Sequence, residues 1–242
     1  MAGKILIYGA SGGIGSATAR TLHAHGYDLH LVGRGADKLA AIGRELGVGF
    51  TVGDVLDGNV FARVSQEAGE RLDGLVYAVG TINLKPLHRL AEADFLHDFR
   101  VNAMGAALAI QAAAPALKKA DGVASVVLFS SVAALQGFTF HASIGMVKAA
   151  IGGLTLSLAT ELAPKVRVNA VAPSLTRTRL ADGILSNEQT AAAIAGLHAL
   201  QRLGEPQDIA ALASFLISTE AAWITGQIIG VDGGRSSLRT KG

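Results

Sequence analysis

Short apolar runs alternate along this chain with longer segments in which apolar residues recur every three or four positions. The runs predict strands buried on both faces, at residues 4–9, 28–33, 48–54, 74–80, 123–131, 166–173 and 226–234. The periodic segments predict helices at residues 14–25, 37–46, 60–71, 91–117, 143–162 and 208–218, the fourth with a break near Asn102. Strands that alternate with helices predict an α/β fold, with a doubly wound, mostly parallel sheet and helices on both faces.

The alternation continues without interruption along the chain. There is no Pro- or Ser-rich linker and no internal repeat, so we expect one domain over residues 1–242. The least regular stretch is residues 174–205, between the sixth strand and the last helix. Because ligands of doubly wound sheets bind beyond the carboxyl ends of the strands, this long connection is a predicted substrate lid.

Composition removes several classes of function. Half of the 242 residues are hydrophobic and the formal net charge is only +2, which excludes a disordered chain. The absence of cysteine excludes disulfide scaffolds and thiolate chemistry, and the seven histidines lack ligand spacing, so we expect no metal. We expect no nucleic acid partner, since there is no basic run, and no membrane partner, since no apolar run reaches the roughly 18 residues that span a bilayer. A cytoplasmic protein without a signal peptide is the resulting expectation.

A glycine-rich turn follows the first strand and opens a helix. Gly9, Gly13 and Gly15 allow a ligand to approach the backbone closely, and the helix start supplies free N–H groups and the positive end of its dipole. An ordinary glycine-rich turn is the alternative interpretation. Its place at the first strand–helix turn favours a Rossmann-type dinucleotide site, with Ser11 and Ile14 among the predicted contacts.

The glycine spacing, Gly-x3-Gly-x-Gly, resembles that of the short-chain dehydrogenase/reductase family, and so do ordered residues through nearly the whole chain. Further matches are Asp54-Val55, Gly80, Asn102, Ser130-Ser131, Lys148, Pro173 with Thr178, RLGEPQDIA (202–210) and ITGQIIGVDGG (224–234). The resemblance implies a nicotinamide-dependent oxidoreductase. It implies contacts of Asp54 and Val55 with adenine, of Lys148 with the nicotinamide ribose and of Thr178 with the carboxamide, with Gly80 and Pro173 beside the cofactor.

The end of the second strand indicates which dinucleotide binds. A carboxylate there would bind the ribose 2′-hydroxyl of NAD, but the tip is Gly33-Arg34. Arg34 can pair with a 2′-phosphate and stack on adenine. A solvated surface arginine is the alternative interpretation, and Asp37 is predicted to cap a helix. We therefore expect NADP rather than NAD.

The sequence departs from the family pattern at one catalytic position. Family members carry a tyrosine four residues before the lysine, and this tyrosine protonates the substrate oxygen. In many relatives the same residue lies thirteen after the strand-end serine. Both counts lead to position 144, which is Ile144. The three tyrosines, Tyr8, Tyr27 and Tyr77, are predicted to lie elsewhere in the fold.

His141 is the predicted substitute donor. It lies seven residues before Lys148, which returns it to within about 20° of the same helix face. Enoyl-thioester reductases of the superfamily place their tyrosine at this spacing, and an imidazole can donate a proton near neutral pH. Ser131 would orient the substrate oxygen, and Asn102 would hold the helix break and a water. The alternatives are that His141 is an ordinary polar residue at a helix start and that Ser131 satisfies buried backbone groups. Ser143 is predicted to cap the helix.

Three functions remain open at this point. The first is an NADP(H)-dependent oxidoreductase that transfers hydride to or from a small carbonyl or hydroxyl substrate, with Asn102, Ser131, His141 and Lys148 as catalytic residues. The second is an enoyl-thioester reductase. The third is a non-catalytic NADP-binding sensor or assembly protein, favoured by the missing tyrosine and opposed by the retained lysine. Relatives are mostly tetramers, so the resemblance also implies a homotetramer or homodimer.

Overall fold

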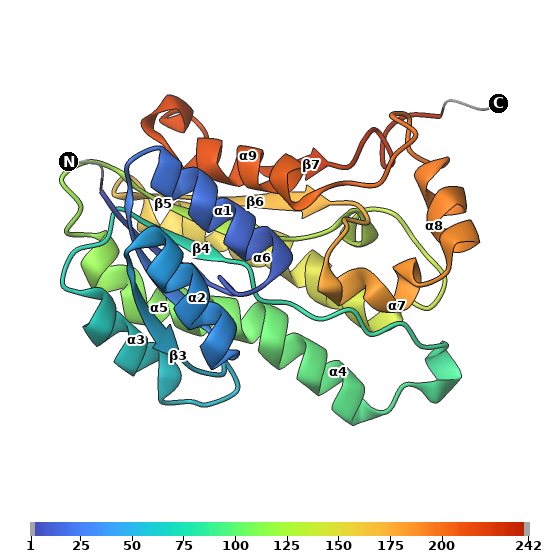
Figure 1. Cartoon of the computed structure of the whole chain (residues 1–242), viewed down its shortest axis with the longest axis horizontal. Coiled ribbons are helices and arrows are strands. Elements are labelled where there is room, and N and C mark those ends of the chain that lie inside the picture. Colours follow the sequence, from blue (N-terminus) through green and yellow to red (C-terminus); the bar gives the residue numbers. More distant parts are fainter. Residues whose placement is uncertain (1–2, 240–242) are drawn as a thin grey trace.

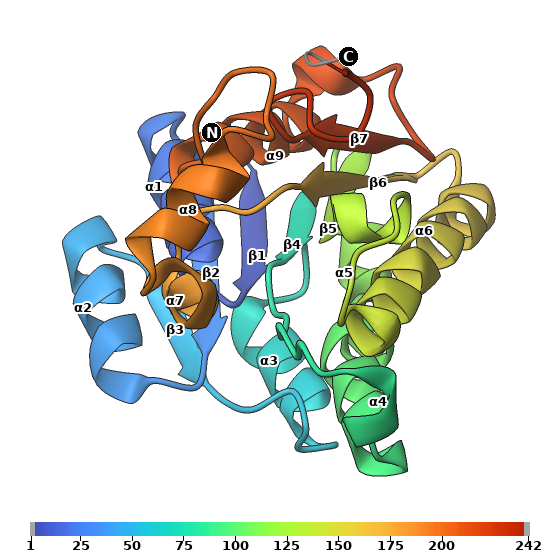
Figure 2. The same cartoon turned by 90° about the vertical axis from the view of Figure 1, so that its right-hand side faces the viewer.

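The computed structural model describes residues 3–239, which are built around one parallel sheet of seven strands. Figure 1 shows the whole chain, and Figure 2 shows the strand order, which is β3-β2-β1-β4-β5-β6-β7. The strands are β1 (Lys4–Tyr8), β2 (Asp28–Gly33), β3 (Gly49–Val52), β4 (Gly74–Tyr77), β5 (Ala124–Phe129), β6 (Val166–Pro173) and β7 (Ile228–Val231). The chain winds outward from β1 first to β3 and then, from β4, to β7, so the predicted single-domain, doubly wound α/β fold is confirmed.

Helices cover both faces of the sheet (Figure 2). One layer holds α1 (Gly13–Ala24), α2 (Ala36–Leu46) and α9 (Pro206–Ile217); the other holds α3 (Val60–Ala68), α4 (Glu92–Phe99), α5 (Gly105–Leu117) and α6 (Ala142–Leu162). Strand side chains alternate between two cores, since Ile5 and Ile7 pack toward the α1 layer while Leu6 and Tyr8 pack toward the α3 layer. Burial on both faces explains why the strands are continuous apolar runs.

The break expected near Asn102 is confirmed as a π-helical turn (Arg100–Met104) between α4 and α5. Asn102 is buried, and its Nδ2 donates to the carbonyl oxygen of Asp98 over 2.8 Å. Such a turn bulges the helix outward and re-aims one side chain, which is why π-turns often accompany functional sites. Here the turn brings Asn102 next to Gly80, just beyond the end of β4.

Two predicted helix caps are wrong. Gly35 occupies the N-cap of α2, and Asp37 lies inside the first turn. The N-cap of α6 is His141, and the Ser143 hydroxyl donates to the buried carboxylate of Asp98 instead. The prediction rested on residue type, since Asp and Ser side chains often accept hydrogen bonds from the first N–H groups of a helix. Here Gly35 and His141 occupy the N-cap positions, and neither helix has a side-chain cap hydrogen bond.

Several element ends also differ from the prediction. Helix α3 ends at Ala68 because Gly69 adopts a positive φ of 106°, and α9 begins at Pro206, which suits a first helical turn. Residues 174–205 are more ordered than expected, since they contain a 3-10 turn and two helices, Arg179–Ala181, α7 (Asp182–Leu185) and α8 (Glu188–Ala195). Further 3-10 turns occupy Leu87–Arg89, Val132–Ala134 and Thr219–Ala221.

Helix α6 is long and apolar enough to cross a membrane by length and composition alone. Its apolar residues are accounted for within the fold, because Val147, Ile151 and Leu162 belong to the core between α6 and the sheet. The helix also carries Lys148 on the side that faces the carboxyl end of β5. We therefore interpret α6 as a core helix that positions a functional side chain.

Candidate active site

The glycine loop between β1 and α1 is closed by backbone contacts that a side chain would prevent. Gly9 has a φ of +80°, and a Cβ there would collide with the carbonyl of Ala78. A Cβ on Gly15 would collide with the carbonyl of Gly9. These two glycines are therefore required by the tight strand–helix turn itself, in addition to any ligand.

The start of α1 fits an anionic ligand. Its N-cap is Gly12, no side chain caps the helix, and no acidic residue lies in the first turn. The first N–H groups and the positive dipole end are therefore available to a phosphate. A Cβ on Gly13 would lie 2.7 Å from the Thr178 methyl group, so the loop directly adjoins the segment after β6. This cradle, too narrow for side chains, fits the diphosphate of a dinucleotide.

The predicted adenine end of the site lies beside β2 and β3. A Cβ on Gly33 would lie 2.7 Å from the Ser11 hydroxyl, so Ser11 sits against the end of β2. Arg34 Nη1 lies 3.6 Å from a carboxylate oxygen of Asp54, and both side chains are exposed. Val55 packs against the α3-side core. An exposed ion pair contributes little stability, about 0–1 kcal/mol, so Arg34 can exchange Asp54 for another anion.

A cavity of about 370 Å³ lies beyond the carboxyl ends of the central strands, as expected for a doubly wound sheet. Of the predicted site residues, those that line it are Ile14, Gly80, Ser131, His141, Lys148, Pro173 and Thr178. Those outside its lining are Gly9, Ser11, Gly13, Gly15, Arg34, Asp54, Val55 and Asn102. The residues of the first set surround the cavity. Most residues of the second set belong to the glycine loop and to the strand ends beside the cavity.

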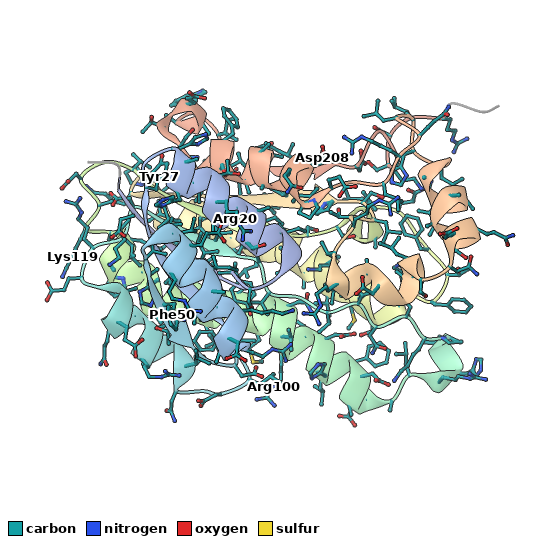
Figure 3. The ribbon with its side chains drawn as sticks, in the orientation of Figure 1. Arg20, Tyr27, Phe50, Arg100, Lys119 and Asp208 are labelled. Atoms are coloured by element: carbon teal, nitrogen blue, oxygen red, sulfur yellow. The ribbon has the colours of Figure 1, made fainter. Side chains whose placement is uncertain are left out.

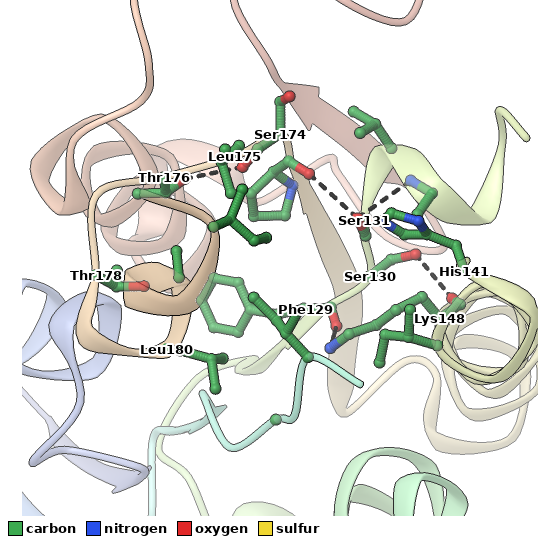
Figure 4. Close-up of a pocket in the computed structure, with 18 of the residues that line it drawn as sticks. Phe129, Ser130, Ser131, His141, Lys148, Ser174, Leu175, Thr176, Thr178 and Leu180 are labelled. Carbon is green, nitrogen blue, oxygen red and sulfur yellow. Dashed lines mark hydrogen bonds between the residues drawn. The ribbon is translucent and has the colours of Figure 1, made fainter. Parts of the chain in front are cut away.

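Lys148 points from α6 toward the end of β5. Its Nζ donates to the carbonyl oxygen of Phe129 over 2.9 Å, and the Ser130 hydroxyl donates to the Lys148 carbonyl over 2.8 Å (Figure 4). Burial lowers the pKa of the Lys148 ammonium to about 8, and the carboxylate of Asp98 opposes this shift. An ammonium held at the edge of an apolar cavity is costly unless a polar ligand meets it, so its position favours a role toward a ligand.

Asn102 presents an unsatisfied oxygen to the same corner. Its Nδ2 donates to Thr81 Oγ1 over 2.9 Å as well as to the Asp98 carbonyl, while its Oδ1 is buried without a partner among residues 3–239. A Cβ on Gly80 would lie 3.0 Å from this oxygen and 3.4 Å from Lys148 Nζ. Glycine at position 80 therefore keeps open a small polar space between the two side chains.

Asp98 is a buried functional candidate that the sequence reasoning missed. Its carboxylate accepts hydrogen bonds from the hydroxyls of Thr81, at 2.7 Å, and Ser143, at 2.6 Å. Through these bonds it links α4, the segment after β4 and the start of α6. The sequence contained one feature that could have identified Asp98. This residue lies one helical turn before Asn102, on a helix that continues into the π-turn.

Ser131 and His141 line the cavity on the same side as Lys148 (Figure 4), and Ile144 lines the cavity as well. The Ser131 hydroxyl accepts from the Ala133 N–H at 3.1 Å and lies 3.4 Å from the Pro173 carbonyl, a long bond that leaves the hydroxyl available. His141 Nδ1 lies 2.7 Å from the carbonyl of Thr139. Since a carbonyl only accepts, Nδ1 carries a proton, and Nε2 is the nitrogen left for chemistry.

The three tyrosines do not line this cavity. Tyr8 and Tyr77 stack in the core with ring centroids 5.7 Å apart, and burial raises the pKa of both phenols. The Tyr77 hydroxyl donates to the carbonyl of Val101 over 2.7 Å. Tyr27 precedes β2 at the opposite end of the sheet (Figure 3). Position 144, which does line the cavity, is an isoleucine.

The segment after β6 closes the far side of the cavity with apolar side chains. These are Leu175, Leu180, Ile184, Ile194 and Leu197. His198, which the sequence reasoning left unassigned, is buried and fastens this segment: its Nδ1 lies 2.9 Å from the Ile194 carbonyl and its Nε2 lies 2.8 Å from the Ser174 hydroxyl. Among residues 3–239, no group of three or more His, Asp or Glu side chains is arranged to hold a metal ion.

Fold, loop and cavity together define the class of a dinucleotide-binding α/β protein. Known proteins agree. The family described as "Enoyl-(Acyl carrier protein) reductase" matches residues 9–236. A tropinone reductase homolog from Arabidopsis thaliana is 34% identical over 245 residues, covering 97% of this chain and 92% of the relative. L-2,3-butanediol dehydrogenase from Corynebacterium glutamicum is 32% identical over 249 residues, covering 95% and 96%.

Solved structures give the same result. A short-chain type dehydrogenase/reductase from Mycobacterium ulcerans superposes with a TM-score of 0.91 at 31% identity, covering 98% of this chain and 90% of the other. ElxO with NADP bound superposes with a TM-score of 0.89 at 29% identity, covering 98% and 100%. The chain belongs to the short-chain dehydrogenase/reductase family. Membership of this family supports a dehydrogenase or reductase role with a nicotinamide cofactor and a small-molecule substrate.

Proposed function

We propose that the protein is an NADP(H)-dependent oxidoreductase that interconverts a small carbonyl compound and its alcohol with a proton donor other than tyrosine. The observation that carries the proposal is the composition of the cavity. It brings Lys148, Ser131 and His141 together with Ile14 and Thr178, which adjoin the glycine loop.

The bound cofactor supplies the hydride, and the residues of the chain hold the substrate oxygen and its proton. Ser131 donates a hydrogen bond to the carbonyl oxygen and fixes its position. His141 delivers a proton to that oxygen from Nε2, because Nδ1 is held by the Thr139 carbonyl. This delivery requires the imidazolium form, in which both ring nitrogens carry protons. Lys148 binds ribose hydroxyls and adds positive charge beside the oxygen as negative charge develops there.

Arg34 supports NADP over NAD. The end of β2 offers a guanidinium and no carboxylate, and the neighbouring Asp54 is bound to that guanidinium. A 2′-phosphate forms shorter, charge-assisted hydrogen bonds with arginine than an exposed carboxylate at 3.6 Å does, so it displaces Asp54. The relative ElxO, with NADP bound, is consistent with this choice.

A second candidate reaction is reduction of an enoyl thioester. It is supported by the description of the matching family and by His141, which lies in the cavity seven residues before Lys148. Reduction of the carbon–carbon double bond passes through an enolate, whose oxygen needs a hydrogen-bond donor. His141 and Ser131 are suited to that role as well.

Single-turnover oxidation of NADPH distinguishes these functions. We expect consumption with members of a ketone panel and not with enoyl thioesters, and a decrease of about 100-fold in His141→Ala, since general acids contribute about 10²–10⁴-fold. His97→Ala, an exposed histidine of α4, is the matched control. Consumption with enoyl thioesters alone would establish the second reaction. Tight NADPH binding without consumption in either panel would identify a non-catalytic binding protein, and unchanged activity in His141→Ala would eliminate His141 as donor.

We further propose that residues 174–205 act as a substrate lid and that the cytoplasmic protein is a homotetramer or homodimer. The lid is supported by the apolar side chains that α7, α8 and their flanks place on the cavity. Oligomerisation is supported by exposed apolar residues on α5, α6 and the preceding π-turn, among them Met104, Leu108, Met146 and Leu156. Light scattering coupled to size-exclusion chromatography measures the state directly, and a monomer would contradict the proposal.

A further inference from the structure

The charges that line the cavity are unbalanced. Its lining includes the basic side chains of Lys148, Arg235 and His141, but no aspartate or glutamate within residues 3–239. Lys148 donates a hydrogen bond to the Phe129 carbonyl, and its proposed role is to bind the ribose of the cofactor. Arg235 comes from the turn that follows β7, a segment far in sequence from α6. The role proposed above for the cavity does not use this arginine.

Arg235 is held in place by its own turn. The Asp232 carboxylate accepts from the backbone N–H groups of Gly234, at 2.9 Å, and Ser236, at 3.0 Å, and also from the Ser236 hydroxyl. Gly233 and Gly234 have φ values of +59° and +82°, which the tight turn requires. The Asp232 carboxylate is therefore occupied by hydrogen bonds within the turn. These bonds fix the backbone from which the Arg235 side chain extends.

The Arg235 guanidinium lies over the ring of Phe138, 5.4 Å from its centroid. The Phe138 ring in turn lies 5.3 Å from the ring of His141. The guanidinium is half-buried, and no carboxylate of residues 3–239 forms an ion pair with it. A guanidinium over an aromatic ring makes a favourable cation–π contact, and its N–H groups can form two parallel hydrogen bonds with a carboxylate.

We propose that Arg235 binds a carboxylate of the substrate, so that the enzyme acts on oxo acids or hydroxy acids with an apolar body. This proposal rests on the oxidoreductase function proposed above. A carboxylate accepts two parallel bonds from the guanidinium edge and supplies the negative charge that the lining lacks. The apolar walls, from Ile144 to Leu180 and Ile194, accommodate the remainder of the molecule.

A carboxylate fits this wall better than a phosphate does. It carries a single charge, which one guanidinium neutralises, whereas a phosphate monoester at neutral pH carries nearly two. The second charge would need another cation, and the other two basic side chains of the lining, Lys148 and His141, are assigned above to the cofactor and to proton donation. The assignment therefore predicts that oxo acids bind more tightly than uncharged ketones or phosphate esters of the same length.

Matched ligands test the subsite separately from turnover. The dissociation constants of a medium-chain oxo acid, its methyl ester and an oxoalkyl phosphate are measured by calorimetry with protein saturated with NADP⁺. The wild type should bind the acid about 10- to 100-fold more tightly than the ester, the range expected for hydrogen bonds to charged groups. Arg235→Gln should abolish this preference while changing ester affinity less than about threefold. Arg239→Gln, an arginine of the same segment outside the cavity lining, is the control.

The outcomes are distinct. Equal binding of acid and ester, failure of both to bind, tighter binding of the phosphate, or a preference that survives Arg235→Gln would each overturn the carboxylate subsite. Thermal unfolding of the variants shows whether Arg235→Gln remains folded, and Arg235→Lys, which keeps the charge without the fork, should retain part of the preference. An Arg235-dependent preference in a protein that oxidises no NADPH would support the subsite and contradict the catalytic function.

Discussion

The two halves of the sheet prepare their sites in different ways. The half from β1 to β4 holds its predicted ligand with backbone: glycines closed against carbonyl groups, and an uncapped helix start. The half from β5 to β7 holds its predicted ligand with side chains that arrive from separate connections. The first arrangement depends on glycines, while the second depends on the side chains that line the cavity, among them Ile144 and Arg235. Cofactor binding and substrate chemistry can thus diverge independently on one fold.

Restoring a tyrosine is the strongest test of that contrast. Ile144 lies on the cavity wall four residues before Lys148, so Ile144→Tyr places a phenol beside a lysine ammonium that lowers its pKa. We expect ketone reduction to rise by about 100-fold or more, within the usual range for general acids. Steady-state kcat/KM provides the measurement, and Ile144→Phe, with the ring but no hydroxyl, should show no gain. Equal rates in the two variants would mean that the β5–β7 half no longer holds the family geometry.

Lys148 belongs to both halves, so its removal should affect both. In Lys148→Met we expect kcat/KM to fall by about 100-fold, because a charge-assisted contact contributes about 1.5–3 kcal/mol. The free energy of unfolding should not fall in parallel, since a partly desolvated charge is removed along with its bond to the Phe129 carbonyl. Kinetics and urea denaturation of the same preparation separate the two effects. A proportional loss of stability would indicate a structural lysine.

Arg34 tests the β1–β4 half alone. Arg34→Ala should weaken NADPH binding by about tenfold, the loss of one exposed charge-assisted contact, while NADH affinity changes little. Fluorescence titration with both cofactors measures the ratio. Arg44→Ala, in the last turn of α2, is the control and should leave both affinities unchanged. Equal affinity of the wild type for NADPH and NADH would contradict the assignment of NADP.

The smallest expected effect is a pH dependence, which has opposite signs for cofactor binding and for the stability of the fold. Burial lowers the pKa of Lys148 from 10.5 to about 8 in the folded chain. Between these values the unfolded chain binds more protons, so the Lys148 contribution to the free energy of unfolding rises with pH in this window. Cofactor binding should instead weaken above pH 8, where the ammonium is lost.

Denaturant titrations and cofactor titrations from pH 7 to 10 test this dependence. Lys148→Met should flatten both profiles in that window. A cofactor affinity that stays constant in the wild type across pH 8 would show that the charge of Lys148 does not contribute to binding.

Features that depend on neighbouring residues could be predicted from the sequence, whereas features that depend on contacts between distant segments could not. The parallel sheet and a helix break near Asn102 were predictable because strand runs and helical periodicity are local, whereas the π-helical form of the break was not predicted. Gly9 and Gly15 were predictable because the turn they form is local as well. Two caps were wrong because residue type was the only signal for them, and the residues at the N-cap positions, Gly35 and His141, make no side-chain cap hydrogen bond. The role of Asp98 was missed because it depends on hydrogen bonds from the Thr81 and Ser143 hydroxyls, which belong to two other segments.

The sequence by itself determined the α/β architecture, the glycine loop and the absence of tyrosine at position 144, because each is written in neighbouring or evenly spaced residues. Only the tertiary structure decided what surrounds that position. It brought His141 to the cavity wall with Nε2 free, left the three tyrosines outside the cavity lining, and set Arg235 over Phe138 from a distant turn. Such contacts depend on how strands and loops far apart in the chain pack together, and no local pattern encodes them.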